Sequence, residues 1–176
     1  MKTHLHKGMC AFALLITFLS GCTQGQPHPQ NQMSYQLDES HSAIMTIDES
    51  TGMTQNGNDP FSIFNADGDI VAQGTFISAA EYDEYVALLT SQDGQNGLTI
   101  LEKSQSDGLG EYVLYKYDSS GDTARSDDAA QFIEYDCISK ISNSNYGAMI
   151  GSTESEEIAR NVFASLNITI SGKGDE

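Results

Sequence analysis

Residues 146–170 read YGAMIGSTESEEIARNVFASLNITI, and the order of secondary structure predicted in this stretch decides the fold class. Its first part, residues 146–150, is an apolar run that predicts a strand. Thr153 and Glu156 then have the spacing of a helix-capping box, and the apolar residues between 158 and 166 recur at helical intervals. A strand followed closely by an amphipathic helix indicates a domain in which a sheet packs against helices.

A second helix is predicted near the middle of the chain. Ser78 and Glu81 repeat the capping-box spacing. The apolar residues that follow occupy one helical face: Tyr82, Tyr85, Val86 and Leu89. Further strands are predicted at residues 43–47, 61–64, 70–77, 98–102, 112–117, 132–138 and 168–170, with a polar loop over 52–60. Because turn residues separate most of these strands, we expect one antiparallel sheet packed with two helices, an α+β fold.

The composition changes near both ends of the chain. Residues 22–34 are rich in Gln, Pro and Asn and offer little apolar surface to bury, which predicts a flexible tether. We expect a single α+β domain over residues 35–170, a length that is sufficient for one hydrophobic core. Residues 171–176 are predicted to form a short polar tail.

The N-terminal residues are organised like a secretory signal. Lys2 and Lys7 give a positive start, and residues 9–19 form an apolar run too short for a spanning helix, which takes about 20 residues. The run ends in Leu19-Ser20-Gly21-Cys22, which resembles the lipobox of bacterial lipoproteins. The resemblance implies that residues 1–21 are a removable signal peptide and that Cys22 carries a diacylglycerol. An ordinary secretory signal with an incidental cysteine is the alternative.

A lipid on Cys22 implies a location and a first partner. The domain would lie on the extracytoplasmic face of the cell membrane or the outer membrane, and the membrane itself would be bound through the lipid. Removal of residues 1–21 takes away Lys2 and Lys7 and no acidic residue, which leaves 6 basic and 25 acidic residues and a net charge of −19. Nucleic acid is excluded as a partner, because its binding depends on Lys and Arg that neutralise phosphates.

The closing part of the chain also resembles a known fold family. Residues 146–153, YGAMIGST, and 156–168, EEIARNVFASLNI, are similar to the closing strand, turn and helix of the PsbP/Mog-type sandwich. The resemblance covers residues 35–170 in the order of elements, and its similarity in sequence is confined to the closing unit. It implies a role as a binding or assembly factor without catalysis, and it assigns no functional residue.

One cysteine, Cys137, lies outside the signal and the lipidation site. Strand alternation places it on the same face as Ile133 and Tyr135. Glu134 and Asp136 point to the other face. This pattern indicates a small buried hydrophobic residue, whereas a catalytic thiolate would require electropositive surroundings.

Two histidines lie outside the signal, and neither has the setting of a catalytic base. His28 falls in the tether, and His41 stands between Ser40 and Ser42. The chain contains no Gly-x-Ser-x-Gly motif that would expose a nucleophilic serine. We therefore assign no catalytic residue and expect His41 to lie in an exposed loop or at a strand edge.

One turn offers weak candidates for calcium ligands. Asn65, Asp67 and Asp69 supply oxygen atoms at alternate positions, as calcium-binding loops do. The twelfth position counted from Asn65 is Phe76, where such a loop would place a closing carboxylate. The prediction is a hairpin turn with Gly68 at positive φ, with calcium binding as the alternative.

Three functions are consistent with these features. The first is a lipid-anchored domain that binds an unknown protein or small molecule, or assists assembly, without catalysis or a cofactor. The second is a small cell-surface hydrolase whose site residues meet only in the fold, and the third is a calcium-dependent adhesion module. A deep pocket with convergent polar groups and shifted pKa values would favour the enzyme, and an apolar patch or sheet face would favour binding.

Replacing Cys22 tests the lipid anchor. We expect Cys22→Ala to release the chain from membranes or to trap it as an uncleaved precursor, because the thioether bond to lipid is lost. Membrane fractionation and the mass of the mature N-terminus measure both outcomes. Unchanged membrane retention with normal processing would show that Cys22 carries no lipid.

Overall fold

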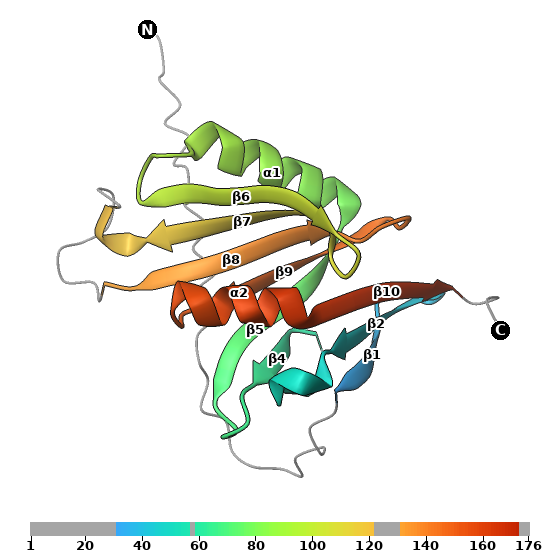
Figure 1. The fold of residues 1–176 in the computed structure, drawn as a ribbon. Helices are drawn as coiled ribbons and strands as arrows, with labels where there is room; N and C mark the ends of the chain where they lie inside the picture. Colours follow the sequence, from blue (N-terminus) through green and yellow to red (C-terminus); the bar gives the residue numbers. More distant parts are fainter. Residues whose placement is uncertain (1–30, 57–58, 122–130, 173–176) are drawn as a thin grey trace, which may run out of the picture.

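Two antiparallel sheets and two α-helices make up the computed structural model, which describes residues 31–56, 59–121 and 131–172 (Figure 1). The smaller sheet has the strand order β1-β2-β10. Its strands are β1 (Gln32–Gln36), β2 (His41–Ile47) and β10 (Leu166–Gly172). The α+β class is confirmed, but the prediction of a single sheet is wrong.

The larger sheet has the strand order β3-β4-β5-β9-β8-β7-β6 and is antiparallel throughout. Its strands are β3 (Thr54–Asn56), β4 (Phe61–Phe64), β5 (Ile70–Ser78), β6 (Leu98–Ser106), β7 (Gly110–Asp118), β8 (Ile133–Lys140) and β9 (Tyr146–Ser152). Short 3-10 turns at Glu49–Thr51 and Ser119–Gly121 complete the elements. Most strands were predicted within a few residues of these bounds.

Helix α1 (Ala79–Gln92) covers one face of the larger sheet. Its predicted capping box is confirmed: the Ser78 hydroxyl accepts a hydrogen bond from the Glu81 N–H, and the Glu81 carboxylate accepts one from the Ser78 N–H. Tyr82 and Leu89 are buried from the helix side, and the strands contribute Val113, Ile138 and Met149. No helix of the described residues is long and apolar enough to cross a membrane.

Helix α2 (Glu156–Ser165) begins later than predicted. The N-cap is Ser155, whose hydroxyl accepts a hydrogen bond from the Ile158 N–H, so the capping box at Thr153 was wrong. With Ser155 as the cap, Glu156 and Glu157 occupy the first turn, where the helix dipole favours negative charge. Leu166 was also assigned to the helix in error, since it opens β10 and pairs with Ile47.

The second face of the larger sheet is covered by α2 together with the smaller sheet. Ala159, Val162 and Phe163 of α2 are buried against this face, which carries Cys137 and Ile150. The side chains of Cys137 and Ile138 are neighbours in β8 and therefore point to opposite faces. Both faces of the strand are covered, which explains why β8 and β9 are buried along most of their length (Figure 1).

Three stretches that were predicted to be irregular contain residues of the sheets. Residues 54–56, inside the predicted loop 52–60, form β3 and pair with β4. Strand β1 begins at Gln32, before the expected domain start, and β10 extends to Gly172, beyond the expected start of the tail. Polar side chains obscured β1, β3 and the last residues of β10, whose middle was predicted at 168–170, because all three strands lie at sheet edges where alternation of apolar residues is weak.

A single buried glutamine joins the two sheets. Gln55 of β3 has no exposed surface. Its Nε2 donates hydrogen bonds to the carbonyl oxygens of Met45 (2.7 Å) and Asn31 (3.0 Å), which belong to the smaller-sheet side of the core. Its Oε1 accepts a hydrogen bond from the Tyr35 hydroxyl at 2.9 Å. Every polar atom of this side chain is therefore used to hold one sheet against the other.

Substitution of Gln55 tests how much its hydrogen bonds between the two sheets stabilise the fold. We expect Gln55→Leu to lower the free energy of unfolding by about 3–5 kcal/mol, because the Tyr35 hydroxyl and two carbonyl groups would lose their partner in the core. Urea unfolding measures the change, and Gln32→Leu on exposed β1 is the matched control.

A double-mutant cycle with Tyr35→Phe isolates one of the three bonds. The double variant should be less destabilised than the sum of the single variants by about 1 kcal/mol, since no unpaired hydroxyl remains. Strict additivity of the two single effects would contradict the pairing of Gln55 with Tyr35.

Candidate functional site

A half-open pocket lies beside α2, where the helix leaves part of the larger sheet uncovered. Helix α2 packs mainly against β5, β8 and β9, whereas β7 and β6 lie at the end of the sheet. The resulting cavity has a volume of about 300 Å³, and we call it the α2 pocket. Five buried side chains form its floor: Leu109, Leu114, Cys137, Phe163 and Leu166.

The side of the α2 pocket is closed by the turn between β6 and β7. A Cβ atom at Gly108 would lie 2.2 Å from the carbonyl oxygen of Leu166, so only glycine allows this turn to approach β10 so closely. The carbonyl oxygen of Gly108 accepts a hydrogen bond from the Ile168 N–H at 2.8 Å. The turn is thus fixed to β10, and the pocket is present without any ligand.

Three polar side chains from three elements meet at the mouth of the α2 pocket. Arg160 of α2 donates through Nη1 to Glu102 Oε2 of β6 (2.9 Å) and through Nε to Glu156 Oε1 (2.8 Å). The Tyr112 hydroxyl of β7 donates to the other oxygen of Glu102 at 2.6 Å. Charge-assisted bonds of this kind are the stronger class of hydrogen bond.

These contacts shift the pKa values of the groups in opposite directions. The hydrogen bond from Tyr112, followed by the one from Arg160, lowers the pKa of Glu102. The same bond raises the pKa of Tyr112, and Glu156 with Glu102 raises the pKa of Arg160. Glu102 therefore stays ionised and Tyr112 stays neutral at physiological pH, so Tyr112 holds the Glu102 carboxylate, which in turn holds Arg160, and neither group is suited to proton transfer.

The prediction that Cys137 is buried is confirmed. The residue is 1% exposed, and burial raises the pKa of its thiol. It lies in the floor of the α2 pocket, with acidic Asp136 and Glu102 as its charged neighbours. A neutral thiol in such surroundings acts as a small apolar surface and is a poor nucleophile.

The candidate calcium ligands form the hairpin turn between β4 and β5. The Asn65 Oδ1 accepts hydrogen bonds from the N–H groups of Asp67 (3.0 Å) and Asp69 (2.9 Å), and Gly68 has a φ of +88°. The hairpin-turn prediction is thereby confirmed, because the oxygen that would bind calcium serves the turn. In the described part of the chain no group of three or more His, Cys, Asp or Glu could hold a metal ion.

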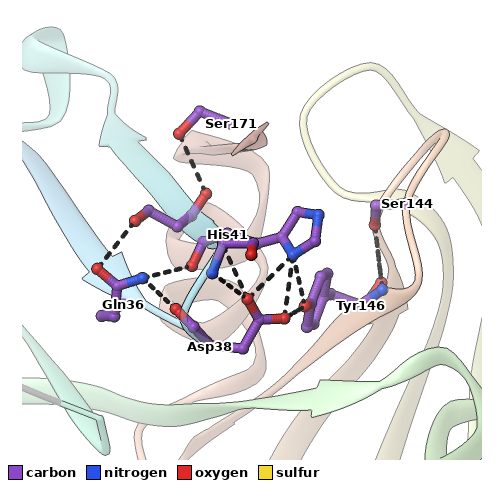
Figure 2. A network of polar contacts seen from close by, with 8 residues as sticks. Gln36, Asp38, His41, Ser144, Tyr146 and Ser171 are labelled. Carbon is purple, nitrogen blue, oxygen red and sulfur yellow. Dashed lines mark hydrogen bonds and ion pairs between the residues drawn. The ribbon is translucent and has the colours of Figure 1, made fainter. Parts of the chain in front are cut away.

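His41 belongs to an exposed network that joins the β1–β2 hairpin to β9 (Figure 2). Its Nδ1 lies 3.0 Å from Asp38 Oδ2, and the Tyr146 hydroxyl donates to the same carboxylate. This hydrogen bond from Tyr146, with others from Ser40 and His41, lowers the pKa of Asp38. The neighbouring Ser42 hydroxyl donates to Gln36, so it is not paired with the His41 ring. The network therefore has a structural role at the edge of the sheets.

Sequence analysis missed an acidic pair on the α1 side of the larger sheet, in which Glu134 is buried and Asp136 is half-buried. Glu134 and Asp136 flank Gly151, where a Cβ atom would lie 3.0 Å from Glu134 Oε1 and 2.6 Å from Asp136 Oδ1. Burial raises the pKa of Glu134 to about 7 and raises that of Asp136 well above its usual range. The Tyr115 hydroxyl is hydrogen-bonded to Asp136. The sequence places both acids on one face of β8, and the covering of that face by α1 is a tertiary feature that the strand pattern does not show.

The α2 pocket was also missed. The i, i+4 spacing of Glu156 and Arg160 is visible in the sequence, but Glu102 lies 58 positions away from Arg160. Residues 1–21, Cys22, His28 and most of the predicted tether lie outside the described residues.

The chain was compared with known protein families, curated proteins and solved structures, and it matches none of them.

Proposed function

We propose that the chain is a lipid-anchored binding protein that holds a small molecule in the α2 pocket on the extracytoplasmic side of a membrane. The observation that carries the proposal is the floor of this pocket, where apolar side chains surround a cavity of about 300 Å³. Pockets of this size and lining are typical of small-molecule sites. The lipobox ending at Cys22 supports the anchor.

The polar groups at the mouth support binding over catalysis. Glu102 is hydrogen-bonded to both Arg160 and Tyr112, and Cys137 in the floor has a raised pKa. The lining residues Tyr112 and Glu102 form a hydroxyl–carboxylate pair, but their hydrogen bond raises the pKa of Tyr112 and lowers the pKa of Glu102, which makes the hydroxyl a poor nucleophile and the carboxylate a weak base. The resemblance to the PsbP/Mog-type sandwich agrees with a binding or assembly role and is proposed with it.

Molecules that co-purify with the chain test the proposal. Ala164 is exposed at the mouth of the α2 pocket, so Ala164→Phe should fill the opening without disturbing the core. We expect wild-type chain, extracted with its surrounding membrane and without detergent, to carry a small molecule that the Phe variant lacks. Mass spectrometry of the extracts measures this difference, and Ala164→Ser is the matched control that leaves the opening free.

Identical small-molecule contents in the wild-type and Ala164→Phe chains would contradict the proposal. A difference shared by the Ala164→Ser chain would also contradict it, because serine adds almost no volume. Thermal unfolding of the three chains checks that each is folded.

A further inference from the structure

We infer that Glu134 and Asp136 bind a calcium ion on the α1 side of the larger sheet, with the amide oxygen of Gln73 as a third ligand. Asp136 and Cys137 are neighbours in β8, so this site and the floor of the α2 pocket lie on opposite faces of the sheet. The inference is therefore independent of the proposed function.

The two carboxylates converge above a glycine. Asp136 of β8 pairs with Gly151 of β9. A Cβ atom at Gly151 would lie 2.6 Å from Asp136 Oδ1 and 3.0 Å from Glu134 Oε1. The two oxygen atoms thus approach the same point, in the space that a side chain at position 151 would occupy.

The Glu134 carboxylate has left water without gaining a partner. The residue is 6% exposed, and no hydrogen bond or ion pair joins it to another residue in the part of the chain that the structure describes. Its charged neighbour is Asp136, which accepts a hydrogen bond from the Tyr115 hydroxyl and is itself an acid. A carboxylate in such a place requires a positive charge beside it, because both burial and like charge oppose its ionisation.

Gln73 adds an unpaired oxygen atom next to the two acids. It pairs with Gly151 from β5, so Gln73, Gly151 and Asp136 form one row across three strands and belong to the same face. The Gln73 Nε2 donates a hydrogen bond to Ser62 Oγ at 3.1 Å. Its Oε1 is buried and, within residues 31–56, 59–121 and 131–172, has no hydrogen-bond partner.

This unpaired oxygen favours a metal ion over a proton between the two acids. A proton shared by Glu134 and Asp136 would remove their repulsion but would leave Gln73 Oε1 unsatisfied, which is unusual for a buried acceptor. A cation would bind all three oxygen-bearing groups. Two carboxylates and one amide are a smaller set than a cluster of three acids, which explains why the charge pattern alone does not reveal the site.

The chemistry of the ligands indicates calcium. Ca²⁺ binds about 6–8 oxygen atoms in a flexible geometry, and these come from carboxylates, amide carbonyls and water. Glu134, Asp136 and Gln73 supply the first two kinds, and water reaches the half-buried Asp136. Mg²⁺ demands a near-ideal octahedron at about 2.0–2.1 Å, which side chains fixed on three strands of a packed sheet are poorly able to form.

Thermal unfolding with added calcium tests the inference. The full chain would be placed in nanodiscs of phosphatidylcholine, a lipid without net charge, and freed of metal with EDTA. We expect about 5 mM CaCl₂ to raise the unfolding temperature by about 3–6 °C, as a dissociation constant of about 0.5 mM implies. MgCl₂ at the same concentration should produce less than about half of this rise, and it controls for the general effect of divalent ions on an acidic chain.

Two variants locate the effect. Glu134→Gln should abolish the rise with calcium, because one carboxylate remains. In EDTA the same variant should unfold at the same or a higher temperature than wild type, since the repulsion with Asp136 is removed, and this separates a lost ligand from a damaged fold. Asp67→Asn is the matched control: it removes one charge from an exposed turn and should keep the full rise.

Crystals of the wild-type chain grown with terbium, an ion similar in size to calcium, place the site directly. We expect an anomalous peak between Glu134 Oε1 and Asp136 Oδ1. Absence of this peak, no rise with calcium in wild type, or an equal rise in Glu134→Gln would each overturn the inference. An equal rise with MgCl₂ would overturn the assignment to calcium. None of these results bears on the α2 pocket, which lies on the other face.

Discussion

The buried side chain of Gln55 is the constraint on which the arrangement of the two sheets depends. The two sheets share one apolar core, and Gln55 adds three directional hydrogen bonds from a side chain without exposed surface. Buried polar groups of this kind specify one geometry, because any shift of the sheets would leave a donor or acceptor unpaired. Aromatic contacts of Tyr35 with Phe61 and Phe76 then fill the space around the joint.

The shape of the α2 pocket depends on the Gln55 hydrogen bonds, because they position β2 and β2 positions β10. Once β2 is fixed against β3, the pairing of β2 with β10 sets the position of Leu166 and Ile168. Leu166 contributes to the pocket floor, and Ile168 holds the β6–β7 turn through Gly108. Helix α2 precedes β10 without an intervening loop, so its position on the larger sheet is set from the same side (Figure 1). The pocket is thus a consequence of how two sheets and one helix meet.

The sequence predicted the elements better than their assembly. Alternation in residues 61–64 and the capping box at Ser78 are local signals, and both predictions are confirmed. Strand β3 was missed because its one buried residue, Gln55, is polar and gives no apolar pattern. Only the side chains that it meets in the folded chain account for its burial, and these are distant in sequence.

Local signals also predicted the α2 pocket less well where its residues are distant in the sequence. Burial of Cys137 follows from its own strand and was predicted, whereas the partnership of Arg160 with Glu102 joins elements 58 residues apart. The acids of β8 show a further limit, since alternation places Glu134 and Asp136 on one face but cannot tell whether a helix covers it. Pairing of distant residues and covering of a face are tertiary properties, and a local pattern does not contain them.

The central claim of this account is that the α2 pocket is an apolar cavity that exists before any ligand binds. Xenon occupies preformed apolar cavities, so crystals of the chain under xenon pressure test the claim most directly. The account predicts a xenon atom in the pocket floor beside Leu114, Cys137 and Leu166, and loss of this atom in Ala164→Phe crystals. A wild-type crystal with α2 in place and no xenon at these residues would contradict it.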